Sequence, residues 1–142
     1  MLAKVAYYPG LTAKEKELIS RHPKEAVLVF LQKQKAESMS YKYFGRDAED
    51  DESDAFRHFV WAALLYKEIG SDLAKDFLDA HEAGQTGSSK GAMDLANNRA
   101  GLLIAEKLVR EKRLTQKEIE EEGIKALRDQ TLSVLNSRGG PK

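Results

Sequence analysis

The sequence predicts an all-α fold, a compact single-domain bundle of five to six helices. Apolar residues recur at helical spacing in successive segments, and helix-starting and helix-stopping residues separate these segments. Strand-like alternation is weak and confined to residues 4–8. Hydrophobic residues make up 42% of the 142-residue chain, which is enough for one sizeable core. We expect one domain over residues 1–142, with an ordered core at 11–137 and a frayed tail at 138–142.

Two helices are predicted near the N-terminus. Thr12 and Glu15 have the spacing of a capping box, so a first helix should run from about Ala13 to Arg21. Pro23 suits the first position of a second helix, in which apolar residues again recur at helical spacing. The stretch that follows, residues 41–53, turns from aromatic to acidic and is typical of an exposed loop.

Four further helices are expected, each with a recognisable start or stop signal. They cover about residues 54–69, 72–83, 93–113 and 115–137. The expected N-caps of the first, second and fourth are Ser53, Ser71 and Thr115, and Gly84 should end the second. Residues 85–92 are rich in Gly and Ser and are typical of a flexible connector.

Composition excludes several classes of protein. The formal net charge is +0, with 23 basic and 23 acidic residues, so nothing global indicates a nucleic-acid partner. The absence of cysteine excludes disulfides, thiolate metal ligands and a cysteine nucleophile. No stretch of about 18 apolar residues predicts a membrane span. The first residues lack the pattern of a signal peptide, so we expect a cytoplasmic protein or one exported by a non-classical route.

The third predicted helix carries one polar stripe on an otherwise apolar circumference. Asp54, Arg57, His58 and Trp61 follow the spacing i, i+3, i+4 and i+7, which places them on one face. A helix that is apolar nearly all round is usually central, so the stripe should face inward or into a cleft. The alternative is a first turn exposed to solvent, with Arg57 paired to the acidic loop.

The next two helices repeat this pattern. His81 extends an apolar face beside Glu82, although a histidine there can also be a satisfied core residue or a helix C-terminal cap. Asp94 shares a face with Asn98 and Gly101, although Asp94 can also be an N-cap. Gly101 costs about 1 kcal/mol relative to Ala inside a helix, and it is sensible only if a backbone or a ligand passes close by.

Three neighbouring helices with inward polar groups predict a convergent cluster. We expect Arg57 to pair with Asp94 or Glu82. We also expect His58 and His81 to meet near Asn98. Such a cluster is either a fully bonded structural network or an active site.

The stretches "DAFRHFVWAALL", "AKDFLDAHE" and "MDLANNRAG" resemble a bacterial all-α domain family of unknown function. Its motifs are Arg-His-x-x-Trp, Asp-Ala-His-Glu and Met-Asp-Leu-x-Asn-Asn, and Ala96 stands where relatives frequently have His. Such domains often lie at the ends of secreted or toxin-like proteins, which implies an immunity or secretion partner. The positions that match the motifs are Arg57, His58, Trp61, Asp79, His81, Glu82, Asp94, Asn97 and Asn98.

These residues predict a small hydrolase or toxin-type effector whose substrate the sequence does not identify. The expected catalytic residues are His58, His81, Glu82 and Asp94, and the expected substrate-binding residues are Arg57, Trp61, Asn97 and Asn98. A histidine base suits a phosphodiester or lipid ester, whereas a pair of carboxylates suits a cell-wall glycan.

We expect no metal and no cofactor, because the H-E-x-x-H spacing is missing, although two histidines and two carboxylates leave a metal site open as an alternative. The alternative function is a non-catalytic helical binding or structural module. Access separates the two functions: an enzyme must expose the cluster in a cleft, whereas a structural network should be sealed and fully hydrogen-bonded.

Overall fold

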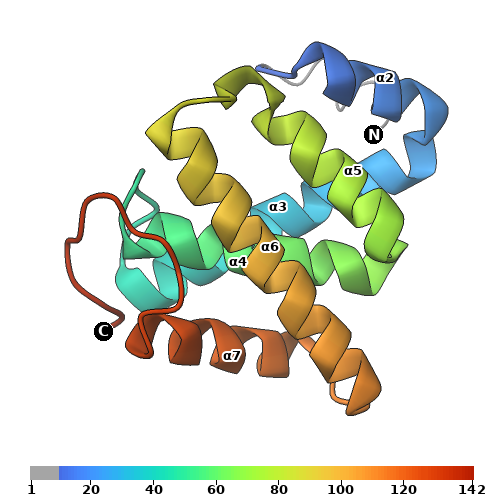
Figure 1. Ribbon diagram of the computed structural model, residues 1–142. Coiled ribbons are helices and arrows are strands. Elements are labelled where there is room, and N and C mark those ends of the chain that lie inside the picture. The colour runs from blue at the N-terminus through green and yellow to red at the C-terminus, as the bar shows by residue number, and fades with distance from the viewer. Residues whose placement is uncertain (1–9) are drawn as a thin grey trace.

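The computed structural model describes residues 10–142, and this part of the chain is all-α, as predicted (Figure 1). Residues 4–8, with their weak strand-like pattern, lie outside it. None of the helices described is both long enough and apolar enough to span a membrane. The elements in chain order are α2 (Ala13–Arg21), α3 (Pro23–Phe44), α4 (Glu52–Ile69), α5 (Ser71–Glu82), η1 (Ala83–Gln85), α6 (Ser89–Arg110) and α7 (Gln116–Arg128).

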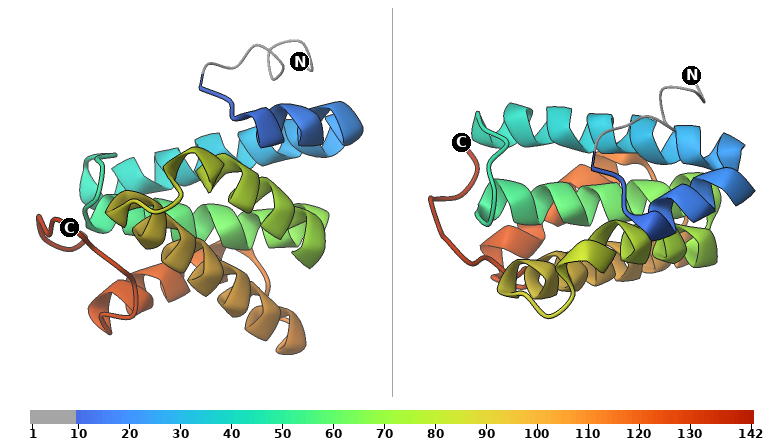
Figure 2. Two further views of the ribbon diagram at one scale, coloured as in Figure 1. Left: turned by 45° about the horizontal axis from the view of Figure 1, so that its top comes forward. Right: turned by 90° about the horizontal axis from the view of Figure 1, so that it is seen from above.

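Helix α4 is the centre of the bundle, as its apolar circumference predicts. It contacts α3, α5, α6 and α7, and every residue from 58 to 65 is buried. Figure 2 shows α4 lying between α3 on one side and the α5–α6 pair on the other. The polar stripe of α4 is therefore enclosed by its neighbours instead of facing open solvent.

Helices α4 and α6 approach each other closely at Gly101. A Cβ atom on Gly101 would lie 2.2 Å from the main-chain oxygen of Phe59 and 2.9 Å from Cβ of Ala62. No side chain fits in that space. The expectation that a backbone passes close to Gly101 is confirmed, and the contact fixes the spacing of the two helices that carry most of the polar cluster.

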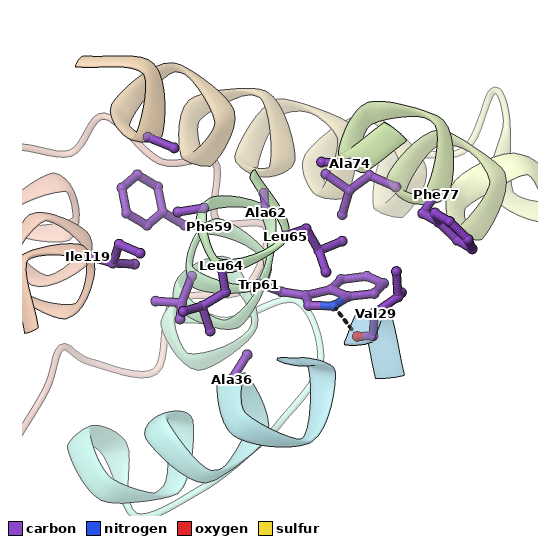
Figure 3. Close-up of a cluster of buried hydrophobic side chains, with 14 of the residues drawn as sticks. Val29, Ala36, Phe59, Trp61, Ala62, Leu64, Leu65, Ala74, Phe77 and Ile119 are labelled. Carbon is purple, nitrogen blue, oxygen red and sulfur yellow. Dashed lines mark hydrogen bonds between the residues drawn. The ribbon is translucent and has the colours of Figure 1, made fainter. Parts of the chain in front are cut away.

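Trp61 joins three helices through its indole ring. The side chain is buried, as predicted, with 3% of its surface exposed. Its Nε1 atom donates a hydrogen bond of 3.0 Å to the main-chain oxygen of Val29 on α3. Figure 3 shows the ring among the buried side chains of the core, and its edge-on contact with the ring of His81 also links it to α5.

The acidic stretch before α4 is not the exposed loop that its composition predicts. Helix α3 continues through Phe44 and ends at Gly45, which has a left-handed conformation with φ of 69°. Asp51 is fully buried and replaces Ser53 as the N-cap of α4. Its Oδ1 atom accepts hydrogen bonds from the amides of Ser53 and Asp54. Burial is tolerated because these donors and the guanidinium of Arg46 satisfy the carboxylate.

Two other predicted helix starts are wrong. Gly70, not Ser71, is the N-cap of α5, and no side chain caps this helix. Helix α6 begins earlier than expected, because the Ser88 side chain accepts a hydrogen bond from the amide of Gly91. Asp94 consequently lies inside α6 and is not an N-cap, which leaves its carboxylate free to face the interior.

The last helix is shorter than its sequence pattern predicts. Helix α7 ends at Arg128, and Gln130 has a positive φ of 57°, which the helix cannot continue through. The segment after it runs back along the bundle. The amide of Arg138 bonds Glu52 at 2.8 Å, and the amide of Lys142 bonds the main-chain oxygen of Tyr43 at 2.8 Å.

Candidate functional site

A cavity of about 560 Å³ opens where α4, the end of α5 and the start of α6 meet. Six of the eight predicted site residues line it, and Asn97 and Asn98 are the two that do not. The lining also includes the start of α2 and the loop between α3 and α4. The six are Arg57, His58, Trp61, His81, Glu82 and Asp94.

His58 lies at the base of the cavity between three carboxylates. Its Nδ1 atom is 3.0 Å from Oδ1 of Asp54, one helical turn earlier on α4. Its Nε2 atom is 3.5 Å from Oε1 of Glu82 on α5 and 3.5 Å from Oδ2 of Asp94 on α6. Three helices thus contribute one acidic group each to a single imidazole ring.

The carboxylates keep His58 charged. Burial alone would lower the pKa of His58, but its contacts with Asp54 and Glu82 and the charge of Asp94 raise the pKa to about 10. In return, His58 holds the pKa of Asp54 and of Glu82 below their usual values, against the upward effect of burial on both. The cluster therefore contains an imidazolium ion near neutral pH.

Asp94 behaves differently from the other two carboxylates. Burial, together with the negative charges of Glu82 and Asp54, raises the pKa of Asp94 to about 6, although His58 opposes the rise. Within the part of the chain described, Oδ1 of Asp94 and Oε1 of Glu82 are buried and have no hydrogen-bond partner. Oε1 of Glu82 nevertheless lies 3.5 Å from Nε2 of His58, so Oδ1 of Asp94 is the oxygen that requires an explanation.

The two cations above the cluster are held by acidic groups. Arg57 pairs with Asp47 at 2.6 Å and with Asp54 at 2.5 Å. The prediction that it pairs with Asp94 or Glu82 is wrong. The pairing with Asp47 is the acidic-loop contact that the alternative interpretation of this stripe describes. Lys90 bonds Glu49 and lies 3.4 Å from Oδ2 of Asp54, which ties the loop to α6.

The two histidines form ion pairs with different carboxylates, and neither bonds Asn98, where we expected them to meet. His81 is 28% exposed at the side of the cavity, and its Nδ1 atom is 3.0 Å from Oε2 of Glu15 on α2. Its ring packs edge-on against Trp61, with 5.0 Å between centroids.

Asn97 and Asn98 are buried on the same helix but differ in their bonding. The side chain of Asn97 exchanges two hydrogen bonds with the backbone of Ser133, at 2.9 and 2.8 Å, and so anchors the segment after α7. Neither polar atom of the Asn98 side chain has a partner among the residues described.

A family model for a domain of unknown function, DUF6973, matches residues 16–131. The chain belongs to the DUF6973 family. The match includes all eight predicted site residues. No curated protein and no solved structure matches the chain. The family assignment confirms the resemblance to an uncharacterised domain family and leaves the reaction to be inferred from the site.

Sequence reasoning missed two members of the site, Glu15 and Lys90, and the contact made by a third, Asp54. Glu15 is visible in the sequence only as the third helical residue of a capping box, and its contact with His81 spans 66 positions. Asp54 is recognised as part of the polar stripe but not as the partner of His58. Lys90 lies four residues before Asp94, a spacing that could have indicated a contact on one helix face.

The cluster of the DUF6973 domain also contains groups that can ligate a metal ion. Ligand atoms of Asp54, His58 and Asp94 lie within 4.8 Å of one another, as do those of Glu49, Asp50 and Asp54. Asp54 belongs to both sets and already contacts Arg57 and Lys90. A metal ion would have to compete with these two cations and with the proton on His58.

Proposed function

We propose that this chain is a hydrolase that uses general acid–base catalysis in the cavity above His58. The observation that carries the proposal is that His58, Glu82 and Asp94, three buried ionisable residues in mutual contact, line an open cavity. A structural network should be sealed from solvent, whereas a site that receives a ligand opens to a cavity lined by ionisable residues.

The roles follow from the charge states of the cluster. Asp94, with a pKa near 6, can carry a proton at close to neutral pH and give it to a leaving group. Glu82 remains ionised beside it. His58 is charged and buried, so it suits electrostatic stabilisation of developing negative charge better than proton abstraction. His81 is the accessible histidine and supplies the base.

Substrate binding is assigned to the same cavity. Arg57 lines it and presents a guanidinium that Asp47 and Asp54 hold in place. Asn98 has free polar atoms but lies outside the lining, and Asn97 is occupied by Ser133. Arg57 is therefore the stronger of the predicted polar substrate contacts.

The alternative of a structural module has one observation in its favour. Arg57 bridges Asp54 and Asp47 through two short ion pairs, which fix the loop to α4. Such a network can specify packing without catalysis. It does not account for the open cavity that His58, Glu82 and Asp94 line, so we favour the hydrolase.

The test measures hydrolysis of fluorescent phospholipid vesicles, RNA, DNA and cell-wall sacculi by the wild type and by His81→Ala. The resemblance to domains of toxin-like proteins adds a second readout, bacterial growth during expression in the cytoplasm or the periplasm. We expect the wild type to hydrolyse one substrate class. His81→Ala should lose that activity while its melting temperature stays within a few degrees of the wild type.

Asp79→Asn is the matched control, because Asp79 lies on the same helix but pairs with Lys75 in solvent. This variant should keep full activity. A wild type that is inert on every substrate and harmless in both compartments, combined with a His81→Ala variant that merely unfolds, would favour the structural module.

A further inference from the structure

We infer that Glu15 is a positioning residue that orients His81 as the general base of the cavity. The inference rests on the proposed hydrolase function and adds a residue from α2 to it. Glu15 lies 66 positions before His81 in the sequence, and its side chain reaches the ring from the helix that covers the end of α5.

The carboxylate of Glu15 divides its two oxygens between two tasks. Oε1 accepts a hydrogen bond of 3.0 Å from the amide of Thr12, which completes the capping box of α2. Oε2 is 3.0 Å from Nδ1 of His81. Glu15 is only 3% exposed, so this arrangement buries a carboxylate at a helix position that is often on the surface. The capping box needs one oxygen only, and the second is free to act on the histidine.

The start of α2 is fixed to the end of α5 independently of this contact. The hydroxyl of Thr12 donates a hydrogen bond of 2.7 Å to the main-chain oxygen of Ala80, the residue before His81. The ring of His81 also packs edge-on against Trp61, at an interplanar angle of 84°. Glu15, Thr12 and Trp61 together hold the ring in one orientation, although the ring remains accessible from the cavity.

This orientation determines which nitrogen of His81 can accept a proton. A carboxylate beside Nδ1 keeps the proton on that atom and leaves the lone pair of Nε2 for a molecule in the cavity. In the proposed step, Nε2 takes a proton from water as the water oxygen bonds to the substrate. The bond to the leaving group breaks, and Asp94 supplies the proton that the leaving group requires. Glu15 stabilises the imidazolium, and solvent then carries the proton from His81 back to Asp94.

Glu15→Gln separates the capping role from the positioning role. Gln is as suitable as Glu at the third position of a capping box, so its single carbonyl oxygen can stay with Thr12. Its amide group then faces Nδ1 of His81 and donates to it. His81 should take the opposite tautomer, with the proton on Nε2, where it can no longer act as the base. In Ser-His-Asp triads, replacing the orienting Asp by Asn lowers the rate by about 10⁴ for this reason.

The experiment compares the wild type, Glu15→Gln and Glu118→Gln by ¹⁵N NMR of the histidine rings, by thermal melting, and by hydrolysis of phospholipid vesicles, RNA, DNA and cell-wall sacculi. Glu118 occupies the corresponding position of α7, where its main-chain amide donates a hydrogen bond to the hydroxyl of Thr115. It does not line the cavity. Glu15→Gln should switch His81 to the other tautomer and lower the rate at least 100-fold, the low end of a general base contribution. Glu118→Gln should do neither.

Each outcome decides a different point. An unchanged tautomer in folded Glu15→Gln would overturn the positioning role, whatever the activity. A switched tautomer with full activity would show that His81 is not the base, and the hydrolase proposal would survive. A wild type that hydrolyses nothing would overturn the hydrolase and the base together, and the NMR spectra would still decide whether Glu15 sets the ring tautomer.

Discussion

Asp54 and His58 form the innermost contact of the candidate site, with Oδ1 and Nδ1 3.0 Å apart on consecutive turns of α4. Asp54 has no exposed surface and also faces Arg57 and Lys90. One carboxylate therefore compensates three cationic groups. The loss of its charge should leave all three without their shared partner.

Asp54→Asn should accordingly lower the free energy of unfolding by about 3–5 kcal/mol, the usual cost of removing one partner of a buried ion pair. Urea denaturation followed by circular dichroism measures this change. Asp79→Asn, which removes the solvent-exposed pair with Lys75, should change stability by less than about 1 kcal/mol. Equal effects of the two variants would contradict the central position of Asp54.

Trp61→Ala should also cost about 3–5 kcal/mol, because it removes a large buried ring and leaves a cavity between α3, α4 and α5. It also leaves the main-chain oxygen of Val29 without its donor. Denaturant melts provide the measurement. A loss below about 1 kcal/mol would place the ring on the surface. Trp61→Phe keeps most of the apolar volume. Its smaller loss of unfolding free energy should therefore report mainly on the hydrogen bond to Val29.

Stability should fall as the pH rises from 7 to 9. The pKa of His58 is about 10 in the folded chain and about 6.5 in an unfolded one, so the folded state holds an additional proton between these values. The stabilisation is complete below about pH 6.5 and is lost as the pH approaches 10. The free energy of unfolding should decrease by up to about 1.4 kcal/mol per pH unit.

Denaturant melts at a series of pH values test this slope, with His58→Gln as the control. The titration of Asp94 does not affect the slope between pH 7 and 9. Its pKa of about 6 places the change in unfolding free energy that it causes at lower pH. The slope between pH 7 and 9 should largely disappear in His58→Gln. A wild type with the same flat profile would show that His58 is neutral in the fold.

Asp94→Asn should separate activity from stability. The raised pKa of Asp94 means that its charged form is less favourable in the fold than in the unfolded chain. At pH 8, the amide should therefore leave the melting temperature unchanged or raise it. Hydrolysis should fall at least about 100-fold, because the amide cannot donate a proton as the acid does. Thermal melts and rate assays on the same sample measure both, and retained activity would remove Asp94 from the proposed mechanism.

The helices of this fold were predictable because their signals are local. Thr12 and Glu15 start α2 as their capping-box spacing predicts. The apolar circumference of α4 correctly predicts its central place. The errors occur where the chain continues or stops a helix for tertiary reasons. Helix α3 extends through Phe44 because that ring packs against Phe56 of α4, a contact that periodicity within α3 does not contain.

The sequence predicted most of the residues that gather around the cavity but not the contacts that they make. Helical spacing places Arg57 and His58 on one face, and it places Asp94 on the inner face of its own helix. Which carboxylate meets which cation depends on how three helices and a loop are docked. Arg57 therefore pairs with the loop residue Asp47, and His81 with Glu15, because these groups are brought near by segments whose positions no local pattern specifies.

The contact at Gly101 has a consequence for the chemistry of the site. Asp94 lies two turns earlier on the same face of α6, and Phe59, which touches Gly101, directly follows His58. Because Gly101 has no side chain, α4 and α6 can pack at this short distance. Any added atom there would move the carboxylate of Asp94 away from the imidazole of His58. Gly101 therefore determines how close Asp94 lies to His58, and hence how strongly each of these groups shifts the pKa of the other.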